Sequence, residues 1–214
     1  MTRLLQLGVL ASGSGSNLQA LIDACANGKV AARVAVVISN VPGARALERA
    51  KAANVPAVLL PHKGGPTPFT TREAYDAALV QVLREHQVDL VCLAGYMRLV
   101  SPVMVQAFQD KILNIHPSLL PSFPGLHAHR QALAAGVRIS GCTVHVVDEG
   151  LDSGPILVQA AVPVVEGDTE DSLAARILVE EHRCYPKAVQ LFAEGRVRLA
   201  VEAGRKRAHI EGAV

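Results

Sequence analysis

Three polar residues have the types that acyl-group chemistry requires. Asn114 and His116 stand at the end of the apolar run KILNIH (111–116), and Asp152 stands in EGLDSG (149–154). If 111–116 is a strand, alternation puts Asn114 and His116 on one face. An amide donor beside an imidazole suits oxyanion stabilisation and proton transfer, and a carboxylate can orient and charge the imidazole. The residues alone leave open that Asn114 and His116 are satisfied polar groups at a strand end.

A glycine-rich turn follows the first apolar run of the chain. SGSGSN (12–17) comes directly after LLQLGVLA (4–11) and before a segment with helical periodicity. In such a unit the backbone amides and the helix N-terminus favour an anion, typically phosphate. The third glycine of the dinucleotide fingerprint is absent, and Val36 and Val37 stand where its acidic residue would be, which disfavours a nicotinamide site. A tight turn without a ligand is the alternative.

Alternating elements must hold these residues in place. The periodicity predicts strands over 4–11, 32–39, 57–60, 89–95 and 111–116, alternating with helices over 18–26, 44–53, 70–86 and 101–108. Asn17 is predicted to cap the first helix, and Ser101 the last of these, with proline at its first position. This βαβα order indicates a parallel sheet with helices on both faces. Asn114 and His116 then lie at the carboxyl end of the last parallel strand, where open α/β sheets bind ligands.

The pattern changes after His116. HPSLLPSFPGLHAH (116–129) contains too many prolines for a strand or a helix interior and is predicted to be a functional loop. The runs 142–147 and 155–164 are predicted to form an antiparallel pair. A long helix is expected from Asp168 to Gly195, kinked or split at Pro186, followed by a strand in VRLAVEAG. The predicted fold is a Rossmann-like three-layer α/β sandwich, mostly parallel, with an antiparallel pair near the C-terminal end.

Composition narrows the class of partner. The 214 residues carry a net charge of +2 with acids and bases interspersed, and only 3% are aromatic. This argues against nucleic-acid and membrane partners. The basic stretch 205–207 is interpreted as a solvated terminus. The four cysteines form no metal-binding or redox pair, and His127 and His129 lack a third ligand at a sensible spacing, so no metal is expected. With no signal sequence apparent, a cytoplasmic location is predicted.

Nearly the whole chain resembles one family, the folate-dependent phosphoribosylglycinamide formyltransferases of purine synthesis. The resemblance is carried by LASGSGSNLQALIDAC, FTTREAYDAAL, LAGYMRLVSP, LNIHPSLLPSFPGLHAHRQAL, GCTVHVVDEGLDSGPILVQAAVPV and EEHRCYP. HPSLLP with Asp152 downstream is specific to formyl transferases that use 10-formyltetrahydrofolate, and SGSGSN narrows the match to the glycinamide ribonucleotide enzymes. The chain departs from the pattern at Ser122, where members can carry a basic residue, and in the acids before Asp152.

The resemblance implies a role for each matching position. The ribonucleotide phosphate is expected at Gly15, Ser16 and Asn17, and the glycinamide end at Glu181. The residues implied for formyl-folate are Arg72, Met97, Arg98, Leu99, Val100 and Asn114. The implied catalytic trio is Asn114, His116 and Asp152. Without the resemblance, Arg72 and Glu181 could also be solvent-exposed charges on helices. Residues 97–100 could likewise be ordinary packing residues after a strand.

The expected reaction is direct transfer of the formyl group of the co-substrate 10-formyltetrahydrofolate to the amine of glycinamide ribonucleotide. A 10-formyltetrahydrofolate hydrolase, a related formyl-folate enzyme and a non-catalytic nucleotide-binding module are the alternatives. We expect a monomer or homodimer built of a single formyltransferase domain, 1–214. In this domain 1–112 form the phosphate-binding βαβ part and 113–200 the catalytic and folate-loop part.

Overall fold

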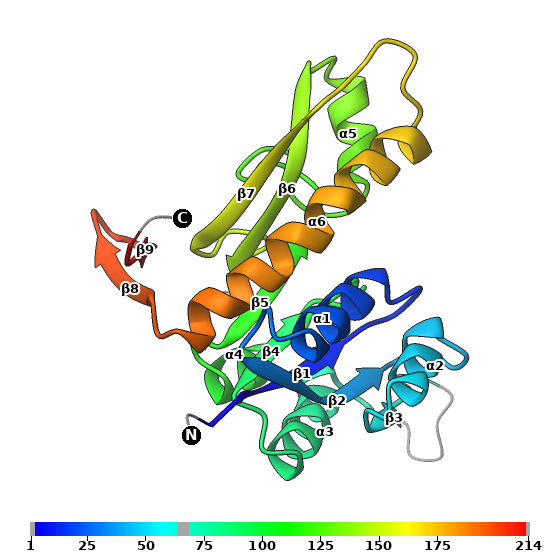
Figure 1. The fold of residues 1–214 in the computed structure, drawn as a ribbon, viewed down its shortest axis with the longest axis vertical. Coiled ribbons are helices and arrows are strands. Elements are labelled where there is room, and N and C mark those ends of the chain that lie inside the picture. Colours follow the sequence, from blue (N-terminus) through cyan, green and yellow to red (C-terminus); the bar gives the residue numbers. More distant parts are fainter. Residues whose placement is uncertain (1–2, 64–68, 213–214) are drawn as a thin grey trace. The chain divides into compact units, whose positions relative to one another are not determined.

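Strands and helices alternate through the first half of the chain. The computed structural model describes residues 3–63 and 69–212, and the chain divides into two compact units, Met1–Leu113 and Asn114–Val214. The elements of the first unit are labelled in Figure 1. They are β1 (Leu5–Leu10), α1 (Ser16–Ala26), β2 (Ala32–Ser39), α2 (Arg45–Ala52), β3 (Ala57–Leu59), α3 (Arg72–Glu85), β4 (Leu90–Leu93) and α4 (Pro102–Ala107).

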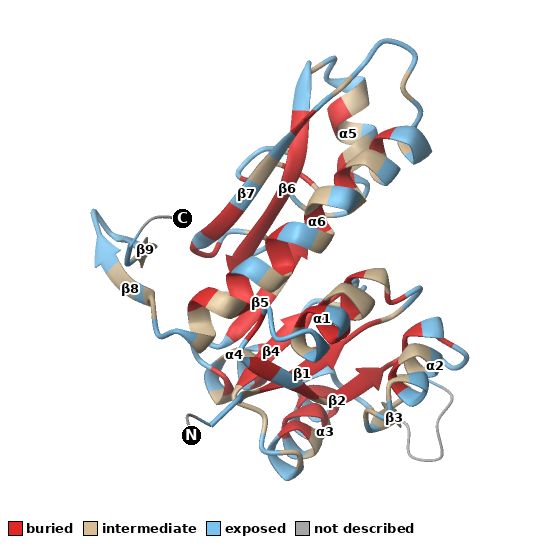
Figure 2. Cartoon of the chain, viewed as in Figure 1, coloured by how far each residue is buried: buried red, intermediate tan, exposed pale blue. Residues whose placement is uncertain are grey.

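The first unit is built on parallel strands in the order β3-β2-β1-β4. Leu7, Val9 and Leu10 of β1 are fully buried, as expected for a central strand covered on both faces (Figure 2). Helix α3 packs so close to β1 that a Cβ on Gly8 would lie 2.4 Å from Leu83 Cδ2. Because β1 and β4 are parallel neighbours, the segments that follow them leave the sheet at the same edge.

The second unit begins within β5 (Ile112–His116) and contains the appended antiparallel strands. Its further elements are α5 (Ala128–Ala134), β6 (Ile139–Val146), β7 (Ile156–Pro163), α6 (Glu170–Ala193), β8 (Val197–Glu202) and β9 (Arg205–Ile210). Helix α6 packs along both β6 and β7 and buries Leu173, Ile177 and Val189. Strands β6 and β7 approach so closely that a Cβ on Gly141 would lie 1.9 Å from the Ala160 carbonyl oxygen.

The predicted fold class is confirmed. The strand order is β3-β2-β1-β4-β5-β6-β7, and β6 and β7 form the antiparallel pair. In the part of the chain that the structure describes, no helix combines the length and apolar character needed to cross a membrane.

One local prediction is wrong and two are wrong in part. The N-cap of helix α1 is Gly15 (φ 70°), and the helix begins at Ser16. Asn17 therefore lies inside the helix and does not cap it. The predicted loop 116–129 ends in α5, which begins after His127 and is built from good helix formers, AHRQALA. Pro186 does not split α6, because the residues around it, among them Tyr185 and Ala188, are buried and hold the helix together despite the missing backbone hydrogen bond.

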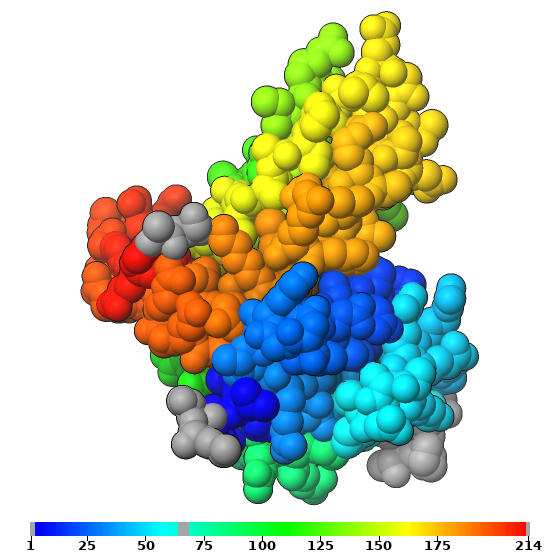
Figure 3. Space-filling view, viewed as in Figure 1, coloured from blue at the N-terminus to red at the C-terminus, as the bar shows by residue number. Residues whose placement is uncertain are grey.

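The C-terminal segment also differs from its prediction. The basic stretch 205–207 is exposed but belongs to β9, which pairs with β8 in a separate two-stranded sheet. The turn between the strands places Ala203 (φ 49°) and Gly204 (φ 76°) in the left-handed region. This geometry is typical of a two-residue hairpin turn. The sequence has Ala203 where the usual Asn-Gly pair has asparagine, so the turn could not be recognised from the sequence. The hairpin, orange-red to red in Figure 3, lies on the surface.

Asp168 makes a clasp that joins the end of β7 to α6, which begins after the cap Thr169. Arg176 Nη1 and Nη2 donate to the Asp168 carboxylate at 2.8 and 2.9 Å. The Ser172 hydroxyl (2.7 Å) and the Val165 amide (2.8 Å) also donate to it. These hydrogen bonds, with Arg176 first, hold the pKa of Asp168 far below its ordinary value of 3.8.

A lowered pKa gives the clasp a defined pH dependence. Its stabilising contribution is fully present above the ordinary carboxyl pKa and is lost as pH falls through the lower folded value. Asp168→Asn is therefore expected to lower the free energy of unfolding at pH 7, with a difference from wild type that stays constant down to about pH 5 and shrinks below it. Urea unfolding over this range measures the difference. The control is Asp171→Asn, which changes an exposed aspartate in the first turn of α6. If the loss of unfolding free energy in Asp168→Asn did not depend on pH, the proposed role of the Asp168 charge would be contradicted.

Candidate active site

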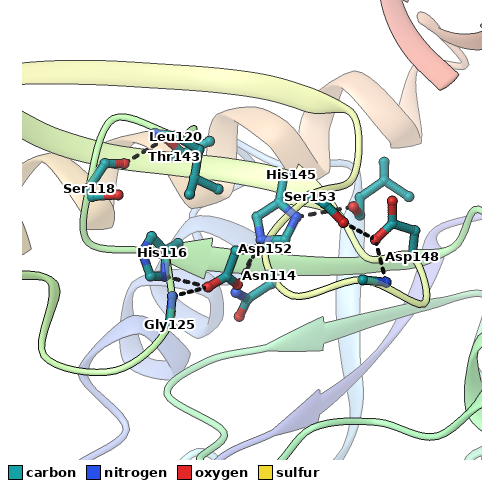
Figure 4. A network of polar contacts seen from close by, with 12 residues as sticks. Asn114, His116, Ser118, Leu120, Gly125, Thr143, His145, Asp148, Asp152 and Ser153 are labelled. Atoms are coloured by element: carbon teal, nitrogen blue, oxygen red, sulfur yellow. Dashed lines mark hydrogen bonds and ion pairs between the residues drawn. The ribbon is translucent and has the colours of Figure 1, made fainter. Parts of the chain in front are cut away.

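Asn114, His116 and Asp152 come together in the second unit (Figure 4). Strand β5 presents Asn114 and His116, and the loop between β6 and β7 brings Asp152 to them. His116 Nδ1 lies 3.3 Å from Asp152 Oδ2, and both side chains are largely buried, 6% and 12% exposed. Asn114 reaches the same cluster through His145, whose Nε2 lies 3.2 Å from the Asn114 amide nitrogen and 3.6 Å from Asp152 Oδ1. The four side chains form one polar cluster.

Both ring nitrogens of His116 face oxygen acceptors. Nδ1 faces the Asp152 carboxylate, and Nε2 lies 2.8 Å from the backbone carbonyl oxygen of Phe123. A carboxylate and a carbonyl only accept hydrogen bonds, so a histidine makes both bonds at once only as the imidazolium ion. Phe123 sits in the left-handed region (φ 56°), which turns the loop back toward the ring. The arrangement fixes the ring between the carboxylate and the carbonyl.

Asp152 is held by the main chain as well as by histidine. Its Oδ2 accepts a hydrogen bond of 2.8 Å from the Gly125 amide. Burial would raise the pKa of the Asp152 carboxyl, but the His145 ring and the Gly125 amide lower it more. The charge of His116 acts in the same direction, and the pKa lies below its ordinary value of 3.8. Asp152 is therefore an anion at neutral pH.

The loop after His116 is fastened to β6 by Thr143. Its hydroxyl donates to the Ser118 carbonyl at 2.7 Å and accepts from the Leu120 amide at 3.0 Å and from Gln159 Nε2 at 2.9 Å. Thr143 and His145 are two positions apart on β6, so both face the loop and the cluster. The sequence alone allows His145 to face either the site or the core. The alternation of β6 was the available signal, but the position of the Asp152 loop was not predictable from it.

The glycine turn, residues 12–17, lies in the first unit and leads directly into α1. Gly15 is buried at φ 70°, and a Cβ on it would lie 2.8 Å from the Ala46 backbone Cα. Arg49 of α2 donates to the Ser14 carbonyl at 2.9 Å. The N-terminal amides of a helix have no acceptor within the helix and carry its positive dipole end. No acidic residue stands in the first turn of α1, so the position favours an anion.

An exposed apolar segment follows β4 in the same unit. Met97 and Leu99 are 66% and 59% exposed, which is unusual for large apolar side chains at an ordered strand end. Arg98 lies between them, with its guanidinium carbon 4.8 Å from the centre of the Tyr75 ring. Val100 is half-buried. The alternation of exposed Met97 and Leu99 with anchored Arg98 leaves an exposed apolar surface on this segment.

The remaining predicted site residues are placed separately. Arg72 is the first residue of α3, 44% exposed, with its Nε 3.9 Å from Glu73 Oε1. Glu181 is buried in α6 in the second unit, not solvated as a surface helix acid would be. Among the described residues no group of three or more histidine, cysteine, aspartate or glutamate side chains is placed to hold a metal ion.

Comparison with known proteins identifies the family of the chain. Residues 5–189 match the formyl transferase family. Phosphoribosylglycinamide formyltransferase of Escherichia coli is 47% identical over 191 residues, covering 89% of this chain and 88% of that protein. The crystal structure of glycinamide ribonucleotide transformylase 1 from Symbiobacterium toebii is 55% identical, with a TM-score of 0.91 over 98% of this chain and 95% of that chain.

A longer relative shares the same region. The trifunctional purine biosynthetic protein adenosine-3 of Drosophila melanogaster is 49% identical over 199 residues, which cover 92% of this chain. The chain spans 14% of the length of that fly protein. The match over residues 5–189 includes both the glycine turn and the cluster around His116, and it shows that the chain belongs to the formyl transferase family.

Proposed function

We propose that this protein transfers the formyl group of 10-formyltetrahydrofolate to the amine of glycinamide ribonucleotide, in the purine biosynthetic pathway. The observation that carries the proposal is the buried contact of His116 with Asp152 beside the Asn114 amide. The glycine turn adds an anion site of the kind that a phosphorylated acceptor requires. Relatives that cover the same residues are named for this reaction.

The proposed reaction is a direct acyl transfer without a covalent enzyme intermediate. The amine nitrogen attacks the formyl carbon, a C–N bond forms, and the carbonyl electron pair moves to oxygen. The electron pair on oxygen then re-forms the C=O bond as the bond from carbon to the folate nitrogen breaks, the amine loses a proton, and the departing folate nitrogen gains one. The products are the N-formyl ribonucleotide and tetrahydrofolate.

Each member of the cluster has a task in this sequence. His116 Nε2 releases the Phe123 carbonyl and donates instead to the oxyanion, then assists proton passage to the folate nitrogen. A primary amide nitrogen carries two hydrogens, so Asn114 can donate one toward His145 and the other to the oxyanion. Asp152 keeps the imidazole charged and fixes its orientation.

The remaining site assignments are those that the resemblance to the glycinamide ribonucleotide formyltransferases implies. Gly15, Ser16 and Asn17 bind the ribonucleotide phosphate through the start of α1, and Glu181 attracts the glycinamide amine. The segment Met97–Val100, with Arg72, receives the folate. We further propose a cytoplasmic location, no metal, and action as a monomer or homodimer on small molecules without nucleic acid or membrane.

Absorbance of the folate tests the proposed function against its alternatives. The protein is mixed with 10-formyltetrahydrofolate with and without glycinamide ribonucleotide. The proposal expects a change that depends on the acceptor. An equal change without acceptor indicates a hydrolase, and no change in either mixture indicates a non-catalytic binding module.

Gly15→Ala tests the phosphate site. Alanine at φ 70° costs about 1–2 kcal/mol in backbone strain, and its Cβ meets the Ala46 backbone. The start of α1 must shift, so we expect the KM for glycinamide ribonucleotide to rise about tenfold or more, with a much smaller change in the KM for formyl-folate. Gly13→Ala is the matched control, because a Cβ there has nothing within 4 Å. Equal effects of the two variants would contradict the assignment.

A further inference from the structure

Ser12 joins the glycine turn to the segment that follows β4. Its backbone N–H donates to the Gly95 carbonyl at 3.0 Å, and its hydroxyl oxygen accepts from the Met97 N–H at 2.9 Å. These bonds flank one short stretch of main chain in the first unit. Because β1 and β4 are hydrogen-bonded neighbours, both ends of the connection start from fixed points of the sheet. The two bonds tie residue 12 of the turn to residues 95–97.

The Ser12 hydroxyl is itself oriented. It donates its single hydrogen to Asn40 Oδ1 at 2.7 Å, and Asn40 Nδ2 lies 3.3 Å from His62 Nδ1. With the hydrogen directed at Asn40, the lone pairs of the hydroxyl oxygen face the Met97 N–H. Ser12 is half-buried, which protects these bonds from exchange with water. An alanine at this position would keep the bond to Gly95 and lose the bonds to Asn40 and Met97.

We propose that Ser12 is a positioning residue that couples the two substrate sites, so that binding of the phosphorylated acceptor strengthens binding of the folate, and the reverse. The inference rests on the proposed function, in which Gly15, Ser16 and Asn17 hold the phosphate and Met97–Val100 receives the pteridine. When the first ligand orders its own segment, the Ser12 hydroxyl orders the other at the same time. The second ligand then meets a smaller entropic cost of binding. Such coupling is reciprocal between the two ligands.

Calorimetric titration measures this coupling. The full chain is titrated with glycinamide ribonucleotide, with and without a saturating tetrahydrofolate analogue that has no transferable formyl group, and then in the reverse order. In wild type each ligand is expected to tighten the other by about fivefold or more. In Ser12→Ala this factor should fall to about one, with each binary Kd within about threefold of wild type, because no direct ligand contact is lost.

Two variants serve as controls. Ser12→Thr keeps the hydroxyl and is expected to restore the coupling. Ser14→Ala changes an exposed serine of the same turn. The backbone carbonyl of residue 14 still accepts from Arg49 in this variant, so the coupling should be unchanged. Asn40→Ala, which frees the hydroxyl to rotate, should weaken the coupling and gives a second test if Ser12→Ala does not fold.

The outcomes separate the inference from the proposed function. Wild type that binds both ligands without coupling overturns the inference and leaves the function standing. Retention of the coupling in Ser12→Ala also overturns it. A loss of binary affinity in Ser12→Ala as large as the loss of coupling makes Ser12 a ligand contact instead of a positioning residue. Wild type that binds neither ligand overturns the proposed function and the inference together.

Discussion

His116→Ala is expected to lower kcat by about 10²- to 10³-fold, the usual cost of losing one oxyanion donor. The variant loses the ring that contacts the Asp152 carboxylate through Nδ1 and the Phe123 carbonyl through Nε2, the nitrogen that is proposed to turn to the oxyanion. Because the lost interaction is made mainly in the transition state, kcat should fall much more than KM rises. Steady-state kinetics with both substrates varied measures the two effects.

Asn114→Ala is expected to lower kcat by about the same factor, because it removes the second oxyanion donor. The matched control is His86→Ala, because His86 is half-buried but bonds the carbonyl of Val82 in its own helix. It should leave kcat near the wild-type value. Near-normal turnover of purified, folded His116→Ala or Asn114→Ala would remove the proposed mechanism.

Asp152→Asn is expected to produce the second large effect, a loss in kcat of about 10²-fold or more. Asparagine matches aspartate in shape and tolerates the left-handed backbone at residue 152 (φ 49°), so the substitution removes charge with little strain. His116 then loses the anion that favours its imidazolium form. The new amide can also place an N–H where the Gly125 amide now donates, which leaves a donor facing a donor.

Asp148→Asn is the control for this prediction. Asp148 lies in the same loop and accepts from the Gly150 amide and the Ser153 hydroxyl on one oxygen, Oδ1, which an asparagine retains. Its kcat should stay near that of wild type. Turnover that falls equally in Asp148→Asn and Asp152→Asn would mean that the loop as a whole, and not the Asp152 charge, supports activity.

The parts of the site that sequence could predict are those set by local periodicity. Alternation along β5 places Asn114 and His116 on one face, and the glycine spacing predicts the turn before α1; both are found. The fold class followed from the alternation of apolar runs with helical segments. These features depend on neighbours in the chain, which a single sequence displays.

The parts of the site that the sequence did not predict depend on how each loop folds back on the strand before it. His116 Nε2 meets the carbonyl of Phe123 in the loop after β5, and His145 of β6 meets Asp152 in the loop after β6. Every residue has a main-chain carbonyl, so the sequence does not indicate which of them accepts a hydrogen bond. Helix α5 and strand β9 were not predicted for a different reason. The chain turns in the left-handed region just before each of them, and it does so at His127 and Ala203, where no glycine marks the turn.

Isotope tracing gives the most direct test of the central claim that the cluster of Asn114, His116 and Asp152 performs formyl transfer. The protein is incubated with glycinamide ribonucleotide and 10-formyltetrahydrofolate labelled with ¹³C in the formyl group, and the carbon is followed by NMR. The account predicts that the label appears in the formamide of the ribonucleotide product, at a rate at least about 100-fold lower in His116→Ala. Label released as free formate in the presence of the acceptor, or equal rates in the two proteins, would contradict it.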